Sequence, residues 1–237
     1  MSLQNKTVVI TGATGALGSE VVKAFHNEGA HIFALVRAVD KLNEIKQSFA
    51  GTKNEIVPVE TDVTDFNSVD KAFSRILSSR GKVDCLLNIA GGFRGGKSIA
   101  DTPVDDWKFM LDLNLSSVFY ASKIAMGIMA GHGGGKIVNV AAMSIFDIKP
   151  KRAAYIVAKA GVAALTQTLA VEGKAFNIQV NAIAPSTILS EANVKDMPDA
   201  DHSTWVTPAR IAETMVFLCG DAADDITGTV IKMPGRV

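Results

Sequence analysis

The chain has 237 residues, of which 24 are basic and 24 are acidic, and 48% are hydrophobic. This length is enough for one α/β domain with a large core, and it leaves no room for a separate substrate domain. Because the formal net charge is zero, we expect neither nucleic acid nor an anionic membrane as a partner, and small neutral ligands or nucleotides fit better.

Cysteine and histidine usage argues against disulfides and metal sites. Cys85 and Cys219 lie in apolar contexts without C-x-x-C spacing, and the four histidines lack metal-ligand spacing. The first strand-like run starts at residue 7, so we expect no signal peptide, and we expect no apolar run of membrane-spanning length. These features predict a soluble, cytoplasmic protein without a catalytic metal.

Short apolar runs rich in Val, Ile and Leu predict buried strands at residues 7–11, 31–36, 55–61, 83–90, 135–142, 178–184 and 228–233. Their nearly continuous hydrophobicity is typical of strands buried on both faces. Apolar positions at helical spacing predict helices within residues 17–29, 66–80, 104–130, 153–175 and 208–219. The alternation predicts a Rossmann-type α/β fold, a doubly wound parallel sheet with helices on both faces, as a single domain over residues 1–237.

Three glycines mark the junction between the first strand and the first helix. Gly12, Gly15 and Gly18 stand in the sequence TGATGALG. Glycine permits a tight turn and lets backbone N–H groups approach a pyrophosphate at the positive end of the helix. The alternative is a purely structural turn, but the position after a buried strand favours a nucleotide site.

A tyrosine and a lysine lie four residues apart in YIVAK, as Tyr155 and Lys159. On a helix, this spacing places both side chains on one face. A tyrosine has a pKa near 10 and is a poor acid or base at neutral pH, but an adjacent ammonium group lowers that pKa. The spacing is typical of a proton-transfer pair, although a surface pair is the simpler alternative.

Seven motifs in order resemble the short-chain dehydrogenase/reductase superfamily over nearly the whole chain. They are TGATGALG (11–18), TDVTD (61–65), NIAGG (88–92), LDLNLSSVF (111–119), YIVAK (155–159), VNAIAPSTILS (180–190) and IAETMVFLCGDAADDITGTVIKM (211–233). The resemblance implies an NAD(P)-dependent oxidoreductase that acts on a small molecule. It also implies cofactor contacts from Gly12, Thr14, Gly15, Leu17, Gly18, Arg37, Asp62, Val63, Asn88, Ala90, Gly91, Tyr155, Lys159, Pro185, Ile188 and Ser190.

The resemblance also implies catalytic roles. Tyr155 would donate a proton to the substrate carbonyl oxygen as hydride arrives. Lys159 would hold the ribose hydroxyls and lower the tyrosine pKa, and Asn114 would anchor a water that links the lysine to solvent. The helices at 104–130 and 153–171 resemble the family's dimer-forming pair, so a homodimer or homotetramer is expected.

The end of the second strand indicates which nicotinamide nucleotide is used. A carboxylate there holds the adenosine ribose hydroxyls of NAD(H), whereas a 2′-phosphate requires its absence and a nearby cation. Val36 stands at the carboxylate position and Arg37 follows it. An arginine can bind a phosphate with two donors, here with help from Thr14 or Lys41. We therefore predict NADP(H) preference, with NAD(H) as the alternative if Arg37 only solvates the helix start.

One family residue is missing. The family has a serine 13 residues before the tyrosine to hold the substrate carbonyl oxygen, and Ala142 stands at that position. Ser144 lies two residues later and would share a face with residue 142 on an extended segment. Ser144 is therefore a candidate replacement, and the alternative is that it only caps a turn.

A narrower resemblance, to dihydropteridine reductases, offers an explanation for Ala142. That branch also has alanine there, and it shares features with AGGFRGGKS (90–98) and with NVKDMPDADHSTWVTP (193–208). The second of these lies in a predicted short substrate lid at about 190–208. Phe93 could stack on a flat ring and Arg94 could bind its polar edge, unless both are simply exposed. The substrate is thus a small carbonyl or a dihydropterin-like ring. The alternative function is a nucleotide-binding or scaffolding pseudoenzyme that lost turnover with the serine.

Overall fold

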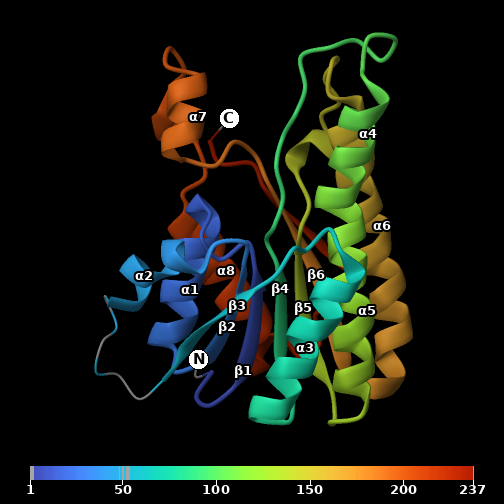
Figure 1. Cartoon of the computed structure of the whole chain (residues 1–237). Helices are drawn as coiled ribbons and strands as arrows, with labels where there is room; N and C mark the ends of the chain where they lie inside the picture. Colours follow the sequence, from blue (N-terminus) through green and yellow to red (C-terminus); the bar gives the residue numbers. More distant parts are fainter. Residues whose placement is uncertain (1–2, 48, 50, 52–53, 237) are drawn as a thin grey trace.

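The computed structural model describes residues 3–47, 49, 51 and 54–236. Seven strands form one sheet, all of them parallel, in the order β3-β2-β1-β4-β5-β6-β7 (Figure 1). They are β1 (Thr7–Thr11), β2 (His31–Val36), β3 (Ile56–Glu60), β4 (Cys85–Asn88), β5 (Gly135–Val140), β6 (Ile178–Pro185) and β7 (Val230–Met233). The predicted Rossmann-type fold is confirmed, with the strand order reversing between β1 and β4.

Helices cover both faces of the sheet (Figure 1). In the described part of the chain they are α1 (Ala16–Asn27), α2 (Asn43–Gln47), α3 (Phe66–Arg80), α4 (Val104–Leu111), α5 (Ser117–Ala130), α6 (Ala153–Gly173), α7 (Glu191–Asp196) and α8 (Pro208–Cys219).

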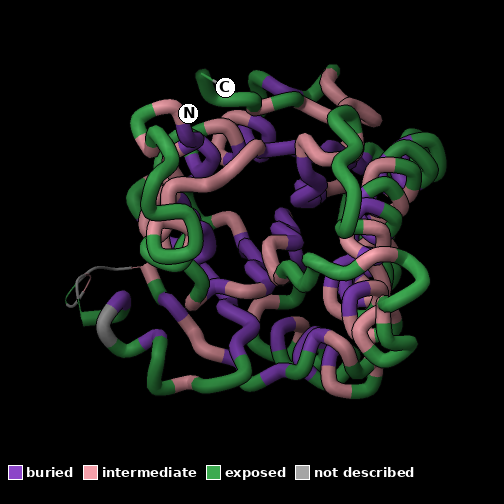
Figure 2. Tube along the Cα trace, turned by 90° about the horizontal axis from the view of Figure 1, so that it is seen from above, coloured by how far each residue is buried: buried purple, intermediate pink, exposed green. Residues whose placement is uncertain are grey.

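The sheet has a hydrophobic core on each face, and the alternating side chains of β1 contribute to both. Val8 and Ile10 join the core under α1 and α8. Val9 joins the opposite core under α3 and α5. Figure 2 shows the buried segments gathered in the interior.

The structure divides the helix expected at residues 104–130. A π-helical turn, Asp112–Ser116, separates α4 from α5. Its central residue, Asn114, donates from Nδ2 to the Met110 carbonyl at 3.1 Å. A side chain that occupies the carbonyl four residues back competes with the regular helix bond, which gives a physical reason for the turn.

The helix expected at residues 153–175 is observed as α6, which ends at Gly173 and is followed by a 3-10 turn, Lys174–Phe176. Its length shows that one prediction was wrong. The segment Ala153–Phe176 is long and apolar enough, by length and composition, to cross a membrane, so the expectation that no run has that length is wrong. α6 packs against β6 and α4 in the folded chain. It also contains the buried Lys159 and Thr166, whose polar groups are bonded within the protein, as in a core helix.

Candidate active site

The turn after β1 forms a backbone cradle. Gly12 has a φ of +68°, and a Cβ there would lie 2.8 Å from the backbone of Ala90. A Cβ on Gly18 would collide with the Gly12 carbonyl oxygen, so only glycine fits. α1 starts after Gly15 with no acidic residue in its first turn, which leaves a positive helix end open to a pyrophosphate. The fold brings together here the expected contacts Gly12, Thr14, Gly15, Leu17 and Gly18.

The end of β4 is fastened to β1 by a side chain that sequence reasoning missed. Thr11 Oγ1 accepts hydrogen bonds from the N–H groups of Ile89 and Ala90 at 3.0 and 3.1 Å. These bonds end β4 before residue 89 and hold its exit beside the glycine turn. The Asn88 side chain points inward and donates to Asn139 Oδ1 at 2.8 Å, so Asn88 shapes the strand end from inside the core.

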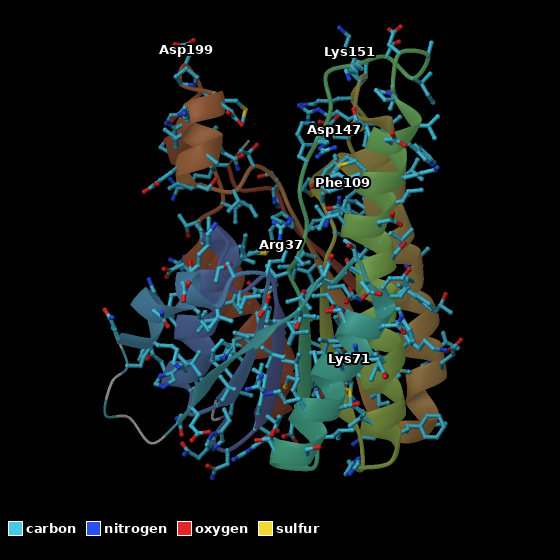
Figure 3. The ribbon with its side chains drawn as sticks, viewed as in Figure 1. Arg37, Lys71, Phe109, Asp147, Lys151 and Asp199 are labelled. Atoms are coloured by element: carbon cyan, nitrogen blue, oxygen red, sulfur yellow. The ribbon has the colours of Figure 1, made fainter. Side chains whose placement is uncertain are left out.

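The residues at the end of β2, where the cofactor preference is expected to be set, include an arginine and no carboxylate. Val36 is buried and Arg37 is exposed directly after the strand; Figure 3 labels Arg37. Asp62, after β3, accepts bonds from the Thr64 N–H and hydroxyl at 2.9 and 2.7 Å. These bonds lower the pKa of the Asp62 carboxyl, and the charge of Arg37 lowers it further. Val63 is buried beside it.

Tyr155 and Lys159 lie on α6 and converge with the loop after β4. Lys159 is 4% exposed, and its Nζ donates to the Val140 carbonyl at 2.7 Å. Nζ lies 6.0 Å from the centre of the Tyr155 ring. A Cβ on Gly91 would lie 2.9 Å from Asn114 Oδ1 and 3.4 Å from Lys159 Nζ. The absence of a side chain at Gly91 therefore lets both polar groups approach the backbone there. Burial lowers the pKa of Lys159 to about 8.

Asn114 is fully buried in the π-helical turn. Its Oδ1 accepts from the Gly92 N–H at 3.1 Å, while its Nδ2 is bonded to the Met110 carbonyl. Both ends of the amide are thus engaged, and they tie the loop after β4 to the α4–α5 helix pair. The irregular turn therefore positions a side chain at the site, as π-helical turns often do.

The environment of Tyr155 differs from the expected one. Burial raises the pKa of its hydroxyl, and the charge that lowers this pKa again is Arg152, whereas the resemblance implied Lys159. The ammonium group of Lys159 is itself desolvated and directed to the Val140 carbonyl. The Phe93 ring packs edge-on against the Tyr155 ring with centres 5.2 Å apart.

The replacement serine sits in a different backbone conformation from the one expected. Ala142 is extended with a φ of −157°, but Met143–Ile145 forms a short 3-10 helix, so residues 142 and 144 do not lie on one extended segment. The Ser144 hydroxyl is buried and has no hydrogen-bond partner among the described residues. It caps no turn, and an unpaired buried hydroxyl costs free energy unless a ligand supplies the partner.

The residues after β6 lead into a helical segment. Ile188 pairs with Val206 in an isolated parallel bridge beyond Pro185, the last residue of β6. Ser190 caps α7 by accepting from the Asn193 N–H at 3.2 Å, so its hydroxyl is engaged in the helix.

The segment expected as a lid, residues 190–208, has a fixed base and an exposed tip. Trp205 and Val206 are buried at the base, and the Arg236 N–H donates to the Thr204 carbonyl at 2.9 Å. Residues 196–201 are all exposed. The segment is therefore attached at its base to the residues that follow β6 and β7.

Comparisons with known proteins agree with this architecture. A family described as short chain dehydrogenase matches residues 6–201. The chain is 28% identical to a 3-oxoacyl-(acyl-carrier-protein) reductase of Thermotoga maritima, over 99% of this chain and 98% of that protein. It is 31% identical to an NAD-dependent glycerol dehydrogenase of Listeria innocua, over 99% of this chain and 94% of that one.

Solved structures give the same result. A short-chain dehydrogenase/reductase from Mycobacterium ulcerans superposes with a TM-score of 0.94 at 26% identity, covering 100% of this chain and 90% of the other. A short chain dehydrogenase from Bacillus anthracis is 33% identical with a TM-score of 0.87, covering 97% and 95%. The glycine cradle, the parallel sheet and the matched sequences lead to one conclusion. The chain belongs to the short-chain dehydrogenase/reductase family and is an NAD(P)-dependent oxidoreductase.

Proposed function

We propose that the protein is an NADPH-dependent reductase of a small carbonyl or dihydropterin-like compound, with Tyr155 as the proton donor. Lys159 and Asn114 meet at the backbone of Gly91, and the Tyr155 ring centre lies 6.0 Å from Lys159 Nζ; this arrangement carries the proposal. A pseudoenzyme is not favoured, because the chain retains Tyr155, Lys159 and Asn114 together, and nucleotide binding alone does not require the tyrosine hydroxyl.

The proposed chemistry divides between the cofactor and the chain. The nicotinamide nucleotide, when bound, supplies the hydride. Burial keeps the Tyr155 hydroxyl protonated at neutral pH, which suits an acid that gives its proton to a substrate oxygen or nitrogen. Lys159 stays fixed by the Val140 carbonyl and has two further N–H donors for the ribose hydroxyls. Asn114 holds the loop in place beside both.

The unpaired hydroxyl of Ser144 supports its role as the donor that Ala142 lacks. We expect Ser144→Ala to lower kcat/KM about tenfold, which is the loss of one hydrogen bond to the substrate. The free energy of unfolding should not fall, because the hydroxyl has no protein partner to lose. Steady-state kinetics and urea unfolding test both points, with Ser78→Ala on α3 as the control. An unchanged kcat/KM would remove Ser144 from the site.

The exposed Arg37 and the apolar Val36 support NADPH preference. We expect Arg37→Ala to lower kcat/KM with NADPH about 10- to 100-fold, because a charge-assisted contact to the 2′-phosphate is lost. The value with NADH should stay nearly constant, since NADH lacks that phosphate. Kinetics with both nucleotides measure the effect, and Arg75→Ala on α3 is the matched control. A wild-type preference for NADH would contradict the assignment, and so would equal losses with both cofactors.

We also propose that residues 190–208 form a substrate lid and that α5 and α6 form a homodimer or homotetramer interface. Exposed apolar side chains on these two helices support the interface: Phe119, Val157 and Val171.

The substrate can be identified by a broad screen, because relatives are named for acyl-carrier-protein, steroid, glycerol and hydroxybutyrate substrates. NADPH oxidation should be measured with aldehydes, ketones, acyl thioester ketones and quinonoid dihydropterin. The absence of turnover with every compound would contradict the proposed function.

A further inference from the structure

Positive charge is concentrated beside Tyr155 although the chain as a whole is neutral. Four basic residues line one small pocket between the loop after β4 and the start of α6, and we call them the basic rim: Arg94, Lys97, Lys151 and Arg152. A single acidic side chain, Asp106, lines the same pocket. The local balance therefore differs from that of the whole chain.

Asp106 neutralises only one half of the basic rim. Its carboxylate is shared by Arg94 and Lys97, at 3.0 and 3.4 Å. Neither Lys151 nor Arg152 forms an ion pair with any described residue. The neighbouring Lys149 differs from them, because it pairs with Asp147 at 3.3 Å. The unbalanced charge thus lies at residues 151 and 152.

The backbone holds the two loops of the rim together. The Gly96 N–H donates to the Lys151 carbonyl at 2.9 Å, and Lys151 has a φ of 64°. A Cβ on Gly95 would lie 3.0 Å from that carbonyl and 2.5 Å from the Phe93 ring, so glycine allows this close approach. Lys151 is therefore held in a left-handed conformation that few residues adopt without strain.

The rim is also connected to the proposed acid. The Arg152 guanidinium lies 5.5 Å from the centre of the Phe93 ring, and Phe93 packs edge-on against Tyr155. One aromatic ring thus separates the unpaired guanidinium from the tyrosine. The charge of Arg152 acts at that distance, because it lowers the pKa of Tyr155 against the effect of burial.

The tip of the proposed lid has the opposite charge to the rim. The exposed tip of the lid carries Asp196, Asp199 and Asp201 against a single Lys195 in residues 195–201. Figure 3 shows Asp199 and Lys151 at the ends of two separate projections of the molecule. An anionic group that approaches this side of the molecule is attracted by the rim and repelled by the tip of the lid, which favours binding at the rim.

We propose that the substrate carries a negatively charged group, a carboxylate or a phosphate ester, besides the group that is reduced, and that Lys151 and Arg152 bind this charge. The proposal rests on the proposed function, because Tyr155 marks where the reduced atom lies. An arginine and a lysine can bind either anion, the arginine through two parallel donors. The rim is then a specificity determinant, and it replaces the expectation of neutral ligands.

Binding can be tested without turnover. Calorimetric titration of the protein with bound NADP⁺ should compare benzoate with benzyl alcohol, and phenyl phosphate with phenol. We expect at least one anion to bind tenfold or more tightly than its neutral counterpart. Lys151→Asn with Arg152→Gln should abolish the difference, and asparagine tolerates the left-handed backbone. The matched control Lys149→Asn should keep it, because Lys149 is already paired. Equal binding of anions and neutral compounds by the wild type would overturn the proposal.

Turnover separates this proposal from the proposed function. The kcat/KM for 4-carboxybenzaldehyde should exceed that for its methyl ester at least tenfold, and 4-formylphenyl phosphate tests the phosphate form in the same way. Loss of this ratio in the double variant supports the rim. Equal reduction of charged and neutral aldehydes overturns the rim and leaves the reductase function intact. Anion binding without reduction of any carbonyl or dihydropterin compound contradicts the function and leaves the rim intact.

An alternative interpretation is that the basic rim binds the acidic tip of the lid when the lid closes, and binds no substrate anion. In that case Asp196→Asn with Asp199→Asn should change the kinetics of charged and neutral aldehydes by the same factor. The proposal instead predicts a selective effect, in which removal of the repelling charges leaves neutral aldehydes unaffected and lowers KM only for charged ones. An equal effect on both classes would overturn it.

Discussion

Tyr155→Phe is expected to lower kcat by about a thousandfold, within the range that general acid catalysis contributes. The substitution removes only the hydroxyl, so the ring should keep its edge-on contact with Phe93. The dissociation constant for NADPH should therefore rise by no more than about tenfold, because one hydrogen bond at most is lost. Steady-state kinetics and a fluorescence titration with NADPH measure the two quantities.

The chain offers a matched control, because Tyr120 is its one other tyrosine. Tyr120 lies on α5 and contacts Phe66 and Phe119 with its ring, away from Lys159. Tyr120→Phe should therefore retain full turnover. If Tyr155→Phe kept more than a tenth of the wild-type kcat, Tyr155 would not be the acid. A wild type that binds NADPH but reduces nothing would favour the scaffolding alternative.

Lys159→Met should stabilise the protein while removing most of its activity. The pKa of Lys159 falls from 10.5 to about 8 because its ammonium group is desolvated, which corresponds to about 3 kcal/mol at neutral pH. Methionine loses the bond to the Val140 carbonyl, so we expect a net gain of about 1–2 kcal/mol in the free energy of unfolding at pH 7. The kcat should fall at least about 100-fold, because the proposed contact that orients the ribose is lost.

The pH dependence gives a second, independent readout. Between pH 8 and 10.5 the unfolded lysine holds more protons than the folded one, so the stability of the wild type rises with pH in this window. The advantage of Lys159→Met should therefore disappear near about pH 9.5. Urea unfolding at both pH values measures it, with the exposed Lys123→Met as the control. A variant less stable than the wild type at pH 7 would show that Lys159 pays no desolvation cost.

Local patterns were sufficient for the fold and for the glycine turn that precedes α1. Every predicted strand exists and every predicted helical segment is helical, although a π-helical turn divides residues 104–130. Buried parallel strands and amphipathic helices impose short-range periodicities on the sequence. The boundaries were less well predicted. The strand expected at 83–90 stops at Asn88, since Thr11 captures the next two N–H groups from a different strand. Asn88 itself points into the core, which no spacing indicates.

The sequence by itself determined the parallel α/β architecture, the glycine cradle, and the pairing of Tyr155 with Lys159, because each depends on residues a few positions apart. Only the tertiary structure decided which charge reaches Tyr155 and which hydroxyl lacks a partner. Arg152 acts on the tyrosine, and the Ser144 hydroxyl stays unpaired in a short 3-10 turn. Burial and electrostatics depend on how the loop after β4 meets the start of α6, and the contact of Gly96 with Lys151 joins residues distant in the sequence.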